Sequence, residues 1–238
     1  MPMIIDKCRK IFFPRHISYD KIYKRLFRFY ANDTKYMLHL GAGKDILGLE
    51  KIGNNKLYLV SLDMNYGQLS KNLNRLKVLG DANNLPFRDS VFDCIFADAF
   101  FEHVRNPGSV LAECSRVSKK NAALIFTTPN KFFYVSLFNL YAPETAKETA
   151  KKFRGVDIQY FPVHYNFNTR KDIYALSGEF GYNVKALHYY TGHPSYFSFS
   201  SVLWILFAIV HKVIEETGFL SHRFHSTFIG ILEKNADA

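Results

Sequence analysis

Seven short apolar runs, separated by polar or helix-like segments, constrain the fold of this 238-residue chain more than any other feature. The runs are residues 36–40, 56–62, 76–80, 92–97, 122–127, 184–190 and 226–232. Strands that alternate with helical segments indicate an α/β fold with a doubly wound, mostly parallel sheet. No helix follows the seventh run to carry a parallel crossover, so we expect an antiparallel last strand. Such sheets bind ligands at the carboxyl ends of their strands.

The length of the chain supports one full hydrophobic core, so we expect a single domain over residues 1–238. The additions to the sheet are a basic, helical N-terminal segment at residues 1–33 and an apolar insert at residues 191–225, before the last strand. The clearest helix lies between the fourth and fifth strands and ends at residues 119–121. Its apolar positions recur at helical spacing: Val110, Leu111, Cys114 and Val117.

The formal net charge of +10 attracts anionic partners such as phosphorylated ligands, nucleic acid or acidic lipid headgroups. Residues 21–30 interleave basic with large apolar side chains, a pattern that suits a membrane surface or a partner groove. The alternative is a helical cap that buries Ile22, Leu26 and Phe29 and keeps its Lys and Arg residues in water. Both interpretations stay open from the sequence.

Three cysteines with no Cys-x-x-Cys pair or His cluster argue against a disulfide framework, and we expect no metal site. With no secretory signal apparent, we expect a cytoplasmic protein. Residues 196–210 carry no charge, yet they fall short of the roughly 20 apolar residues of a membrane span. They form either a buried helix or a helix in the bilayer interface beside Lys212, which would make the protein peripheral at a membrane.

The first apolar run leads directly into Gly41-Ala42-Gly43. Glycines allow a ligand to approach the backbone, and a helix that opens after such a turn directs free N–H groups at a nucleotide-like ligand. The second run ends at Asp63, 20 residues after Gly43. A carboxylate there can accept hydrogen bonds from two ribose hydroxyls. This spacing serves nicotinamide dinucleotides and other adenosine cofactors alike, so a dehydrogenase is a rival interpretation.

Two later stretches separate these cofactors. Residues 80–93 read Gly-Asp-Ala-Asn-Asn-Leu-Pro-Phe-Arg-Asp-Ser-Val-Phe-Asp, and residues 98–104 read Asp-Ala-Phe-Phe-Glu-His-Val. They resemble the type 11-like branch of the class I S-adenosylmethionine-dependent methyltransferases, which carries Asp-Ala-x-x-Leu-Pro-Phe, then Phe-Asp, then Leu-Glu-His-Val. Residues 116–121 and 127–130 resemble the branch's Arg-Val-Leu-Lys-Pro-Gly-Gly and Thr-Pro-Asn motifs. The resemblance runs from about Met37 to Asn130 and implies a seven-stranded, Rossmann-like methyltransferase fold.

The resemblance implies S-adenosylmethionine as the cofactor. Gly41 and Gly43 would approach its methionine moiety, and Asp63 would hold the ribose hydroxyls. Asp81 would accept a hydrogen bond from the adenine amine, and Asp98 would lie beside the methionine end. The implied cofactor-binding residues are Leu40, Gly41, Ala42, Gly43, Asp63, Met64, Asp81, Ala82 and Asp98.

Two positions depart from the family pattern. His39 stands where many members have an acid, which weakens the anchoring of the cofactor's ammonium group. Asp45 stands where they have a third glycine, although its Gly-Lys-Asp loop resembles that of methyltransferases associated with surface-glycan synthesis. The missing glycine also argues against a nicotinamide site. These departures motivate an alternative, a catalytically silent cofactor-binding or scaffold protein on the same fold.

His103 is the candidate general base, because an imidazole can accept a proton from a hydroxyl near neutral pH. The competing interpretation is a structural His103, with methyl transfer driven by alignment alone. Residues 160–169 resemble the branch's His-x-x-x-Phe-Thr stretch, in which Thr169 would cap a helix. We expect the acceptor pocket to include Tyr134, His164 and Tyr165.

The expected reaction is methyl transfer from S-adenosylmethionine to a small-molecule or lipid- or glycan-linked acceptor, in the first place at oxygen. The apolar insert and the basic N-terminal segment favour an amphipathic acceptor. Nucleic acid is not the expected substrate, because no Asn-Pro-Pro-Tyr-type motif for handling bases follows the fourth strand.

Overall fold

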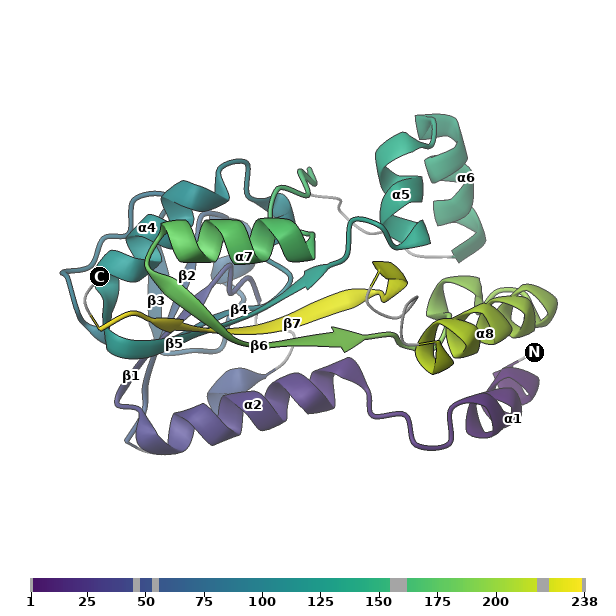
Figure 1. Cartoon of the computed structure of the whole chain (residues 1–238), viewed down its shortest axis with the longest axis horizontal. Coiled ribbons are helices and arrows are strands. Elements are labelled where there is room, and N and C mark those ends of the chain that lie inside the picture. Colours follow the sequence, from purple (N-terminus) through teal and green to yellow (C-terminus); the bar gives the residue numbers. More distant parts are fainter. Residues whose placement is uncertain (1, 45–47, 53–55, 155–161, 218–222, 237–238) are drawn as a thin grey trace. The chain divides into compact units, whose positions relative to one another are not determined.

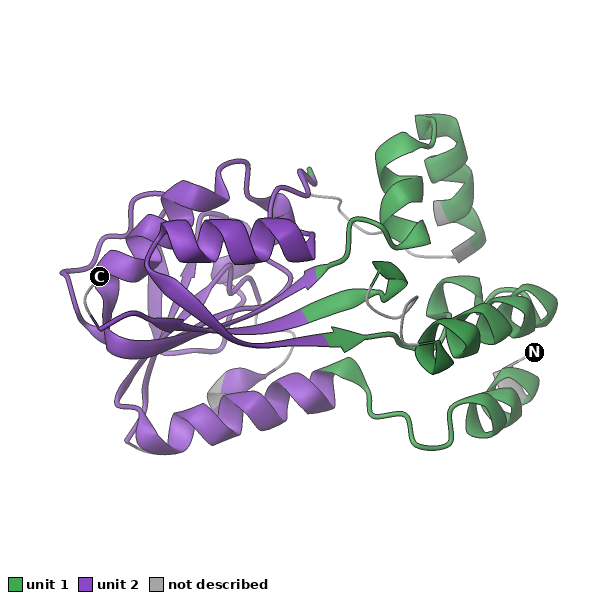
Figure 2. Ribbon diagram, in the orientation of Figure 1, with its two compact units in different colours: residues 1–19, 129–162, 189–228 green, residues 20–128, 163–188, 229–238 purple. Residues whose placement is uncertain are grey.

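The computed structural model describes residues 2–44, 48–52, 56–154, 162–217 and 223–236. The chain divides into two compact units, coloured separately in Figure 2. Unit 1 comprises Met1–Tyr19, Pro129–Pro162 and Tyr189–Phe228, and unit 2 comprises Asp20–Thr128, Val163–His188 and Ile229–Ala238. The single domain expected over residues 1–238 stays a prediction.

All seven predicted strands form, and they make one sheet in the order β3-β2-β1-β4-β5-β7-β6 (Figure 1). Strands β1 to β5 pair in parallel. This arrangement confirms the doubly wound, mostly parallel sheet. The strands are β1 Tyr36–Leu40, β2 Tyr58–Asp63, β3 Leu76–Leu79, β4 Phe92–Ala97, β5 Ser118–Pro129, β6 Tyr182–Tyr190 and β7 Thr227–Lys234.

The hydrogen bonds of β7 show its direction. The N–H of Ser226 donates to Tyr190 at one end of β6, and the N–H of Asn235 donates to Gly181 at the other end. Strand β7 therefore runs antiparallel to β6, which confirms the expected antiparallel last strand.

The helices are α1 Pro2–Phe12, α2 Tyr19–Asp33, α3 Tyr66–Leu69, α4 Pro107–Val117, α5 Tyr134–Tyr141, α6 Glu144–Arg154, α7 Arg170–Glu179 and α8 Ser201–Glu216. Short 3₁₀ turns are η1 Leu49–Lys51, η2 Phe101–His103 and η3 Ser195–Phe197. Helix α4 ends at Val117, before the expected residues 119–121. The N–H groups of Ser90 and Val91 donate hydrogen bonds to the carbonyls of Arg116 and Val117. The chain therefore enters strand β5 directly after the helix.

In unit 2, helix α2 covers one face of the sheet through Tyr23, Phe27 and Ala31. The rings of Tyr23 and Phe27 meet the ring of Phe96 at 5.3 and 5.1 Å between centroids. Burying one such ring stabilises the fold by about 1.5–3 kcal/mol. Of the three residues expected to be buried in a helical cap, Ile22 and Leu26 are partly buried, and Leu26 packs against this core. The expectation for Phe29 was wrong, because Phe29 is 68% exposed. Helices α4 and α7 lie on the opposite face of the sheet (Figure 1).

In unit 1, helix α1 packs on helix α8 (Figure 1). Their shared core contains Ile5, Phe13, Trp204 and Ala208. In the part of the chain that the structure describes, no helix combines the length and the apolar character that crossing a membrane requires.

The three cysteines are free thiols, of which Cys94 and Cys114 are buried and Cys8 is partly buried. The cytoplasmic location inferred from them stays a prediction.

Candidate functional site

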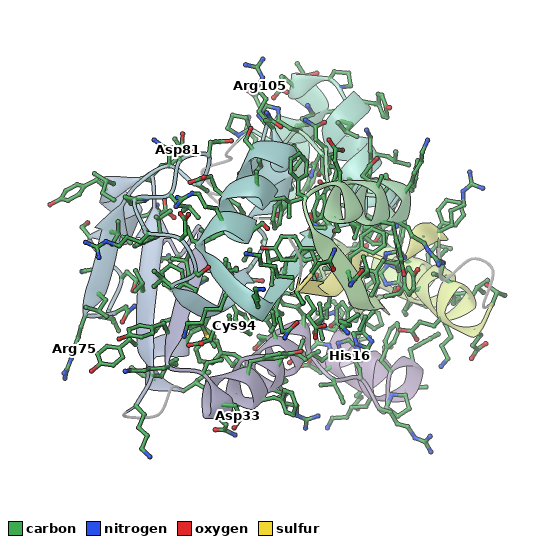
Figure 3. The ribbon with its side chains drawn as sticks, turned by 60° about the vertical axis from the view of Figure 1, so that its left-hand side comes forward. His16, Asp33, Arg75, Asp81, Cys94 and Arg105 are labelled. Atoms are coloured by element: carbon green, nitrogen blue, oxygen red, sulfur yellow. The ribbon has the colours of Figure 1, made fainter. Side chains whose placement is uncertain are left out.

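Most of the predicted cofactor-binding residues gather at one edge of the sheet in unit 2. Gly41 follows β1 and Asp63 ends β2. Asp81 follows β3 and Asp98 follows β4. Because these strands are parallel, their carboxyl ends lie at the same edge. Figure 3 shows Asp81 at this edge, with Arg75 at the other end of β3.

The glycine turn after β1 has the backbone shape that its sequence predicts. Gly41 and Gly43 adopt positive φ angles of 61° and 46°, which disfavour any residue with a Cβ atom. The N–H of Ala42 donates to the carbonyl of Leu62 at 3.0 Å, which ties the turn to β2. A Cβ atom on Gly41 would lie 2.5 Å from Cδ2 of Phe100. The ring of Phe100 therefore rests directly on the glycine turn.

Asp63 joins the glycine turn to the end of β2. Its Oδ2 accepts the N–H of Gly43 at 2.8 Å, and its Oδ1 accepts the N–H of Asn65 at 2.7 Å. Asn65 in turn caps helix α3 by accepting the N–H of Gln68. Each carboxylate oxygen can accept more than one hydrogen bond, so Asp63 keeps acceptor capacity for a ligand. Met64, which follows it, is exposed.

Two buried asparagines, which sequence reasoning missed, hold the glycine turn through hydrogen bonds. Nδ2 of Asn72 donates to the carbonyl of Gly43 at 2.9 Å. Oδ1 of Asn72 accepts the N–H of Asn74, whose own Nδ2 donates to Leu59 and Ser61 on β2. Two Asn residues in a polar stretch look like an exposed turn in the sequence. Only the fold shows that both side chains are buried.

Asp81 lies on the surface at the end of β3. Its Oδ1 accepts both the N–H and the Nδ2 of Asn83 at 2.9 Å. The adjacent Gly80 donates its N–H to the carbonyl of Asp63 at 3.1 Å, which links the loops after β2 and β3. Ala82 is buried beside the exposed carboxylate. Because Asp81 is exposed, a ligand's donor can reach its carboxylate.

The loop after β4 holds Asp98 through a threonine. Thr127 on β5 donates its hydroxyl to Oδ1 of Asp98 at 2.7 Å and accepts the N–H of Ala99 at 2.9 Å. Ala99 has a positive φ of 46°, a strained value for a residue with a Cβ atom. Burial raises the pKa of Asp98 to about 6, although the hydrogen bond from Thr127 lowers it. The loop thus aims Phe100 back across Gly41.

Glu102 and His103 are adjacent in η2 but have opposite surroundings. His103 is exposed, whereas Glu102 is buried and its Oε2 has no hydrogen-bond partner among the described residues. Burial, together with the nearby charge of Asp98, raises the pKa of Glu102 to about 8, against the lowering effect of hydrogen bonds from its own backbone and from Thr128. Glu102 is not among the predicted site residues, although a carboxyl group with such a pKa is typical of a functional site.

The predicted acceptor residues are divided between the two units. The N–H of His164 donates to the carbonyl of Glu102 at 2.7 Å, which brings His164 to the loop after β4. Tyr165 is buried, with a positive φ of 52°. Tyr134 belongs to unit 1, where its hydroxyl lies 3.0 Å from Nε2 of His211.

Sequence analysis also singled out Thr169, His39 and Asp45. Thr169 caps α7 by accepting the N–H of Asp172, as predicted. His39 is buried at the end of β1, and Asp45 lies outside the described residues. Within those residues, no three His, Cys, Asp or Glu side chains are grouped to hold a metal ion.

Residues 38–126 match the family model described as a methyltransferase domain. That segment contains the glycine turn, Asp63, Asp81 and Asp98, and it ends within β5. Over this segment the match confirms the predicted resemblance to the class I S-adenosylmethionine-dependent methyltransferases.

Curated relatives match over part of their length. The chain is 26% identical over 137 residues to demethylmenaquinone methyltransferases from Mycobacterium bovis (strain BCG / Pasteur 1173P2) and Mycobacterium tuberculosis (strain ATCC 25618 / H37Rv). The match covers 52% of this chain and 58% of each relative. The chain therefore spans less than two thirds of the relatives' length.

Solved structures share the fold over most of the chain. An S-adenosylmethionine-dependent methyltransferase from Archaeoglobus fulgidus superposes with a TM-score of 0.59 at 18% identity, covering 95% of this chain and 97% of that one. The [4+2]-cyclase SpnF superposes with a TM-score of 0.58 at 15% identity, covering 92% and 84%. Identities this low show the fold and leave the reaction to the site residues.

Proposed function

We propose that this chain transfers a methyl group from S-adenosylmethionine to an oxygen of a small-molecule or lipid- or glycan-linked acceptor. The observation that carries the proposal is the linked set of groups at the carboxyl edge of the sheet. Asp63 accepts the N–H of Gly43 through its side chain and the N–H of Gly80 through its carbonyl. One residue thereby fixes the spacing of the glycine turn and the loop of Asp81.

The residues present fit the cofactor that the family uses. The turn at Gly41 leaves room only for a hydrogen atom where other residues carry Cβ. Asp63 would accept from the ribose hydroxyls and Asp81 from the adenine amine, beside the backbone of Ala82. Leu40, Ala42 and Met64 would complete the cofactor-binding residues. When bound, S-adenosylmethionine supplies a methyl group already activated by its sulfonium centre.

Phe100 adds an aromatic ring at the methionine end of this site. A ligand that reaches the backbone of Gly41 must also touch that ring, because the two are in contact. A positive charge over an aromatic face gains about 0.5–2 kcal/mol. The nearby Asp98 becomes negative above its pKa of about 6. Ring and carboxylate both favour a cationic ligand, which offsets the absence of an acid at His39.

His103 would accept the proton that the acceptor's hydroxyl releases as oxygen attacks the methyl carbon. The side chain of His103 is exposed on η2. Glu102, with a pKa of about 8, stays protonated at neutral pH and would leave the base role to its neighbour. The other mode, alignment without a base, predicts that His103→Ala keeps most of the activity.

The acceptor class is inferred from the relatives and from the loop after β4. The relatives named demethylmenaquinone methyltransferases support a small-molecule or lipid acceptor. Within the site, His164 reaches the loop after β4 through its backbone, and we propose that it lines the acceptor side with Tyr165. Tyr134, in unit 1, remains a predicted acceptor residue.

Two measurements test the proposal in sequence. Isothermal titration with S-adenosylmethionine should show binding to the wild-type chain, and no binding at millimolar cofactor would contradict the proposal. Extracts incubated with a labelled methyl donor should then yield a labelled product, with membranes and soluble metabolites assayed separately by mass spectrometry.

A second candidate is a cofactor-binding or scaffold protein that does not methylate. The ring of Phe100 on Gly41 favours it, because a ring fixed there would obstruct the methionine end. The fold also serves a [4+2]-cyclase. Cofactor binding without labelled product in either fraction would support this candidate.

A further inference from the structure

We propose that Arg9, His16 and His193 in unit 1 bind a phosphate group. This inference goes beyond the proposed function and does not depend on it. Arg9 lies on α1, His16 follows α1, and His193 follows β6, so three separate segments supply the site. All three residues belong to unit 1, which is green in Figure 2. We call them the basic cluster.

The three side chains of the basic cluster lie close to one another. The rings of His16 and His193 are 5.5 Å apart between centroids and are tilted by 62°. Burial lowers the pKa of both histidines, and the charge of Arg9 also lowers it in each, so the guanidinium lies near both rings. Three groups that can carry positive charge therefore share one small region of unit 1.

Two nitrogen atoms of the basic cluster are buried without a hydrogen-bond partner. They are Nε of Arg9 and Nδ1 of His193, and neither has a partner among the described residues. The N–H of an arginine can only donate, so it requires an acceptor. A buried donor that lacks one costs stability. Oxygen atoms of an anionic ligand would satisfy both nitrogens, with His193 protonated at Nδ1.

The ring of His16 is held by uncharged groups. Its Nε2 lies 3.0 Å from the hydroxyl of Tyr190, and that hydroxyl accepts the N–H of Tyr19 at 3.1 Å. The ring of Phe13 packs edge-on against His16, at 6.2 Å between centroids. These contacts fix the position of the imidazole, but they do not balance a positive charge on it.

The backbone beside His193 is held by His211 on α8. Nδ1 of His211 bonds to the carbonyl of Gly192, and its Nε2 lies 3.0 Å from the Tyr134 hydroxyl. Both ring nitrogens of His211 are thus occupied within unit 1. His211 therefore positions the segment that carries His193 and leaves ligand binding to the basic cluster.

The basic cluster has little negative charge around it. The carboxylate of Asp6 lies 3.3 Å from Nη1 of Arg9, but the Asp6 side chain is 60% exposed, so the pair is weak. Burial, the charge of Arg9 and the charges of two other histidines lower the pKa of His193 to about 4. No acid in the described part of the chain raises the pKa of His16 or His193. A bound anion would supply the missing negative charge.

The geometry of the basic cluster suits a phosphate better than a carboxylate. The oxygens of a phosphate point to the corners of a tetrahedron, whereas a carboxylate offers two oxygens in one plane. The two imidazole rings do not share a plane, and the guanidinium comes from a third segment. A phosphate monoester carries a charge of about −1.5 to −2 near neutral pH, which matches Arg9 with protonated histidine. Charge-assisted hydrogen bonds to phosphate are about twice as strong as neutral ones.

Titration of the full chain with inorganic phosphate tests the proposal. Nuclear magnetic resonance of the histidine rings, at constant ionic strength, should show saturable shifts for His16 and His193. His188, an exposed histidine on β6 in unit 2, is the internal reference and should not shift. Signals of His16 and His193 that move no more than the signal of His188 overturn the proposal.

Two matched arginine variants separate the site from the net charge. Arg9→Gln should raise the Kd for phosphate by about tenfold or more, because a charge-assisted donor is lost. Arg15→Gln removes the same charge from an exposed residue next to His16 and should change the Kd by less than about twofold. Equal effects of the two variants overturn the proposal.

A conservative variant covers the case in which Arg9→Gln does not fold, which circular dichroism reveals. Arg9→Lys keeps the positive charge but lacks the Nε donor, so it should still raise the Kd for phosphate by about threefold. An unchanged Kd in a folded Arg9→Lys chain would show that Nε does not touch the anion, and it would overturn the proposal.

The site should bind anions more tightly as the pH falls. Sulfate is the probe for this dependence, because it keeps its charge while the histidines titrate. A bound anion raises the pKa of His16 and His193, so the Kd for sulfate should fall by about fivefold from about pH 8 to about pH 5.5. Asp6→Asn should lower the Kd at each pH, since it removes a competing carboxylate. A Kd that does not change with pH overturns the role of the histidines and with it the proposal.

Phosphate monoesters occur in free metabolites and in lipid headgroups, and two further probes distinguish these sources. Glycerol phosphate is titrated in the same way as inorganic phosphate, and vesicles that contain phosphatidic acid are tested by co-sedimentation. Tighter binding of glycerol phosphate than of inorganic phosphate, weakened in Arg9→Gln, supports a free metabolite. Sedimentation with the vesicles that Arg9→Gln abolishes and Arg15→Gln preserves supports a lipid headgroup. Binding of either probe that is equal in the two variants overturns the proposal.

Discussion

The two ends of the parallel sheet treat carboxyl groups in opposite ways. At the amino end of β4, burial would raise the pKa of Asp93, but hydrogen bonds from Lys119 and from the N–H groups of Tyr36 and Lys35 hold it below its usual value. At the carboxyl end, burial raises the pKa of Asp98 to about 6. The pKa of Glu102, further along the same loop, is raised to about 8.

This difference separates structural charge from functional charge. An ionised Asp93 stabilises the fold because its partners are in place. An ionised Asp98 or Glu102 costs stability, because burial removes water without an equivalent partner. Carboxyl groups held at such a cost are typical of sites that bind or transform ligands. The amino end thus serves folding, and the carboxyl end serves the proposed reaction.

The largest expected effect comes from replacing one carboxylate by alanine at each end of the sheet. Asp63→Ala should raise the Kd for S-adenosylmethionine by roughly 10²–10⁴, because two charge-assisted hydrogen bonds worth about 1.5–3 kcal/mol each are lost. Asp93→Ala is the matched control and should lower the free energy of unfolding while the Kd stays unchanged. Titration calorimetry and urea unfolding measure the two quantities. Equal weakening of cofactor binding in both variants would contradict the comparison.

The next effect concerns the pH dependence of stability. Between about pH 4.5 and 8, folded Glu102 holds a proton that the unfolded chain has released, so the free energy of unfolding should fall as pH rises through this window. Glu102→Gln should remove this part of the slope, on the order of a few kcal/mol in total. Urea unfolding at pH 5, 7 and 8.5 measures it.

Asp93 should contribute to the pH dependence of the free energy of unfolding with the opposite sign, and Asp93→Asn tests this. The lowered pKa of Asp93 contributes stability above its usual pKa, and this contribution is lost as the pH falls through its folded value. The variant should therefore lose stability near neutral pH and lose less on acidification. For the first of these two variants, the contrary result is a free energy of unfolding of Glu102→Gln that changes with pH as steeply as that of the wild type. That result would show that Glu102 is not protonated in the folded chain.

A smaller effect is expected at the glycine turn. Gly41→Ala should weaken cofactor binding by about 1–3 kcal/mol, from backbone strain and from the collision with Phe100. Adding Phe100→Ala should recover the collision part, so the two changes should be non-additive by about 1 kcal/mol. Gly43→Ala is the control, since its Cβ would find only Asp63 Oδ2 at 4.0 Å. Additive effects of Gly41→Ala and Phe100→Ala on cofactor binding would contradict this. They would mean that the Phe100 ring moves away from the added Cβ atom without cost.

The smallest effect is expected at Asp81. Its exposed carboxylate competes with water for the same donor, so Asp81→Ala should cost about 1 kcal/mol, or roughly fivefold in Kd. Titration calorimetry under the conditions used for Asp63→Ala makes the two directly comparable. A loss as large as that at Asp63 would show that the adenine end, rather than the ribose, dominates binding.

The sequence predicts features that depend on period and on parallel topology. Strand length and alternation located all seven strands, and Thr169 was identified as a cap from its place before a helix. The contact between Gly43 and Asp63 follows from the meeting of parallel strands at one edge. These features arise from backbone geometry that local sequence controls.

Other features depend on packing that local sequence does not specify. Helix α2 carries large apolar residues around most of its circumference, so the choice between Phe27 and Phe29 as the buried ring depended on the fit to Phe96. Glu102 and His103 are neighbours in the chain, and only the turn of η2 decides which is buried. The positive φ of Ala99 has no signal in its residue type.

Asn72 has a consequence for how a ligand would bind. Its amide holds the carbonyl of Gly43 at 2.9 Å, and the N–H of Gly43 is held by Asp63. Both polar groups of this glycine are thus fixed by the chain itself, before any ligand arrives. Binding there need not freeze the backbone, so it avoids the conformational entropy of about 1–2 kcal/mol for each residue that would otherwise become ordered. Association at this turn should therefore be close to the docking of rigid parts.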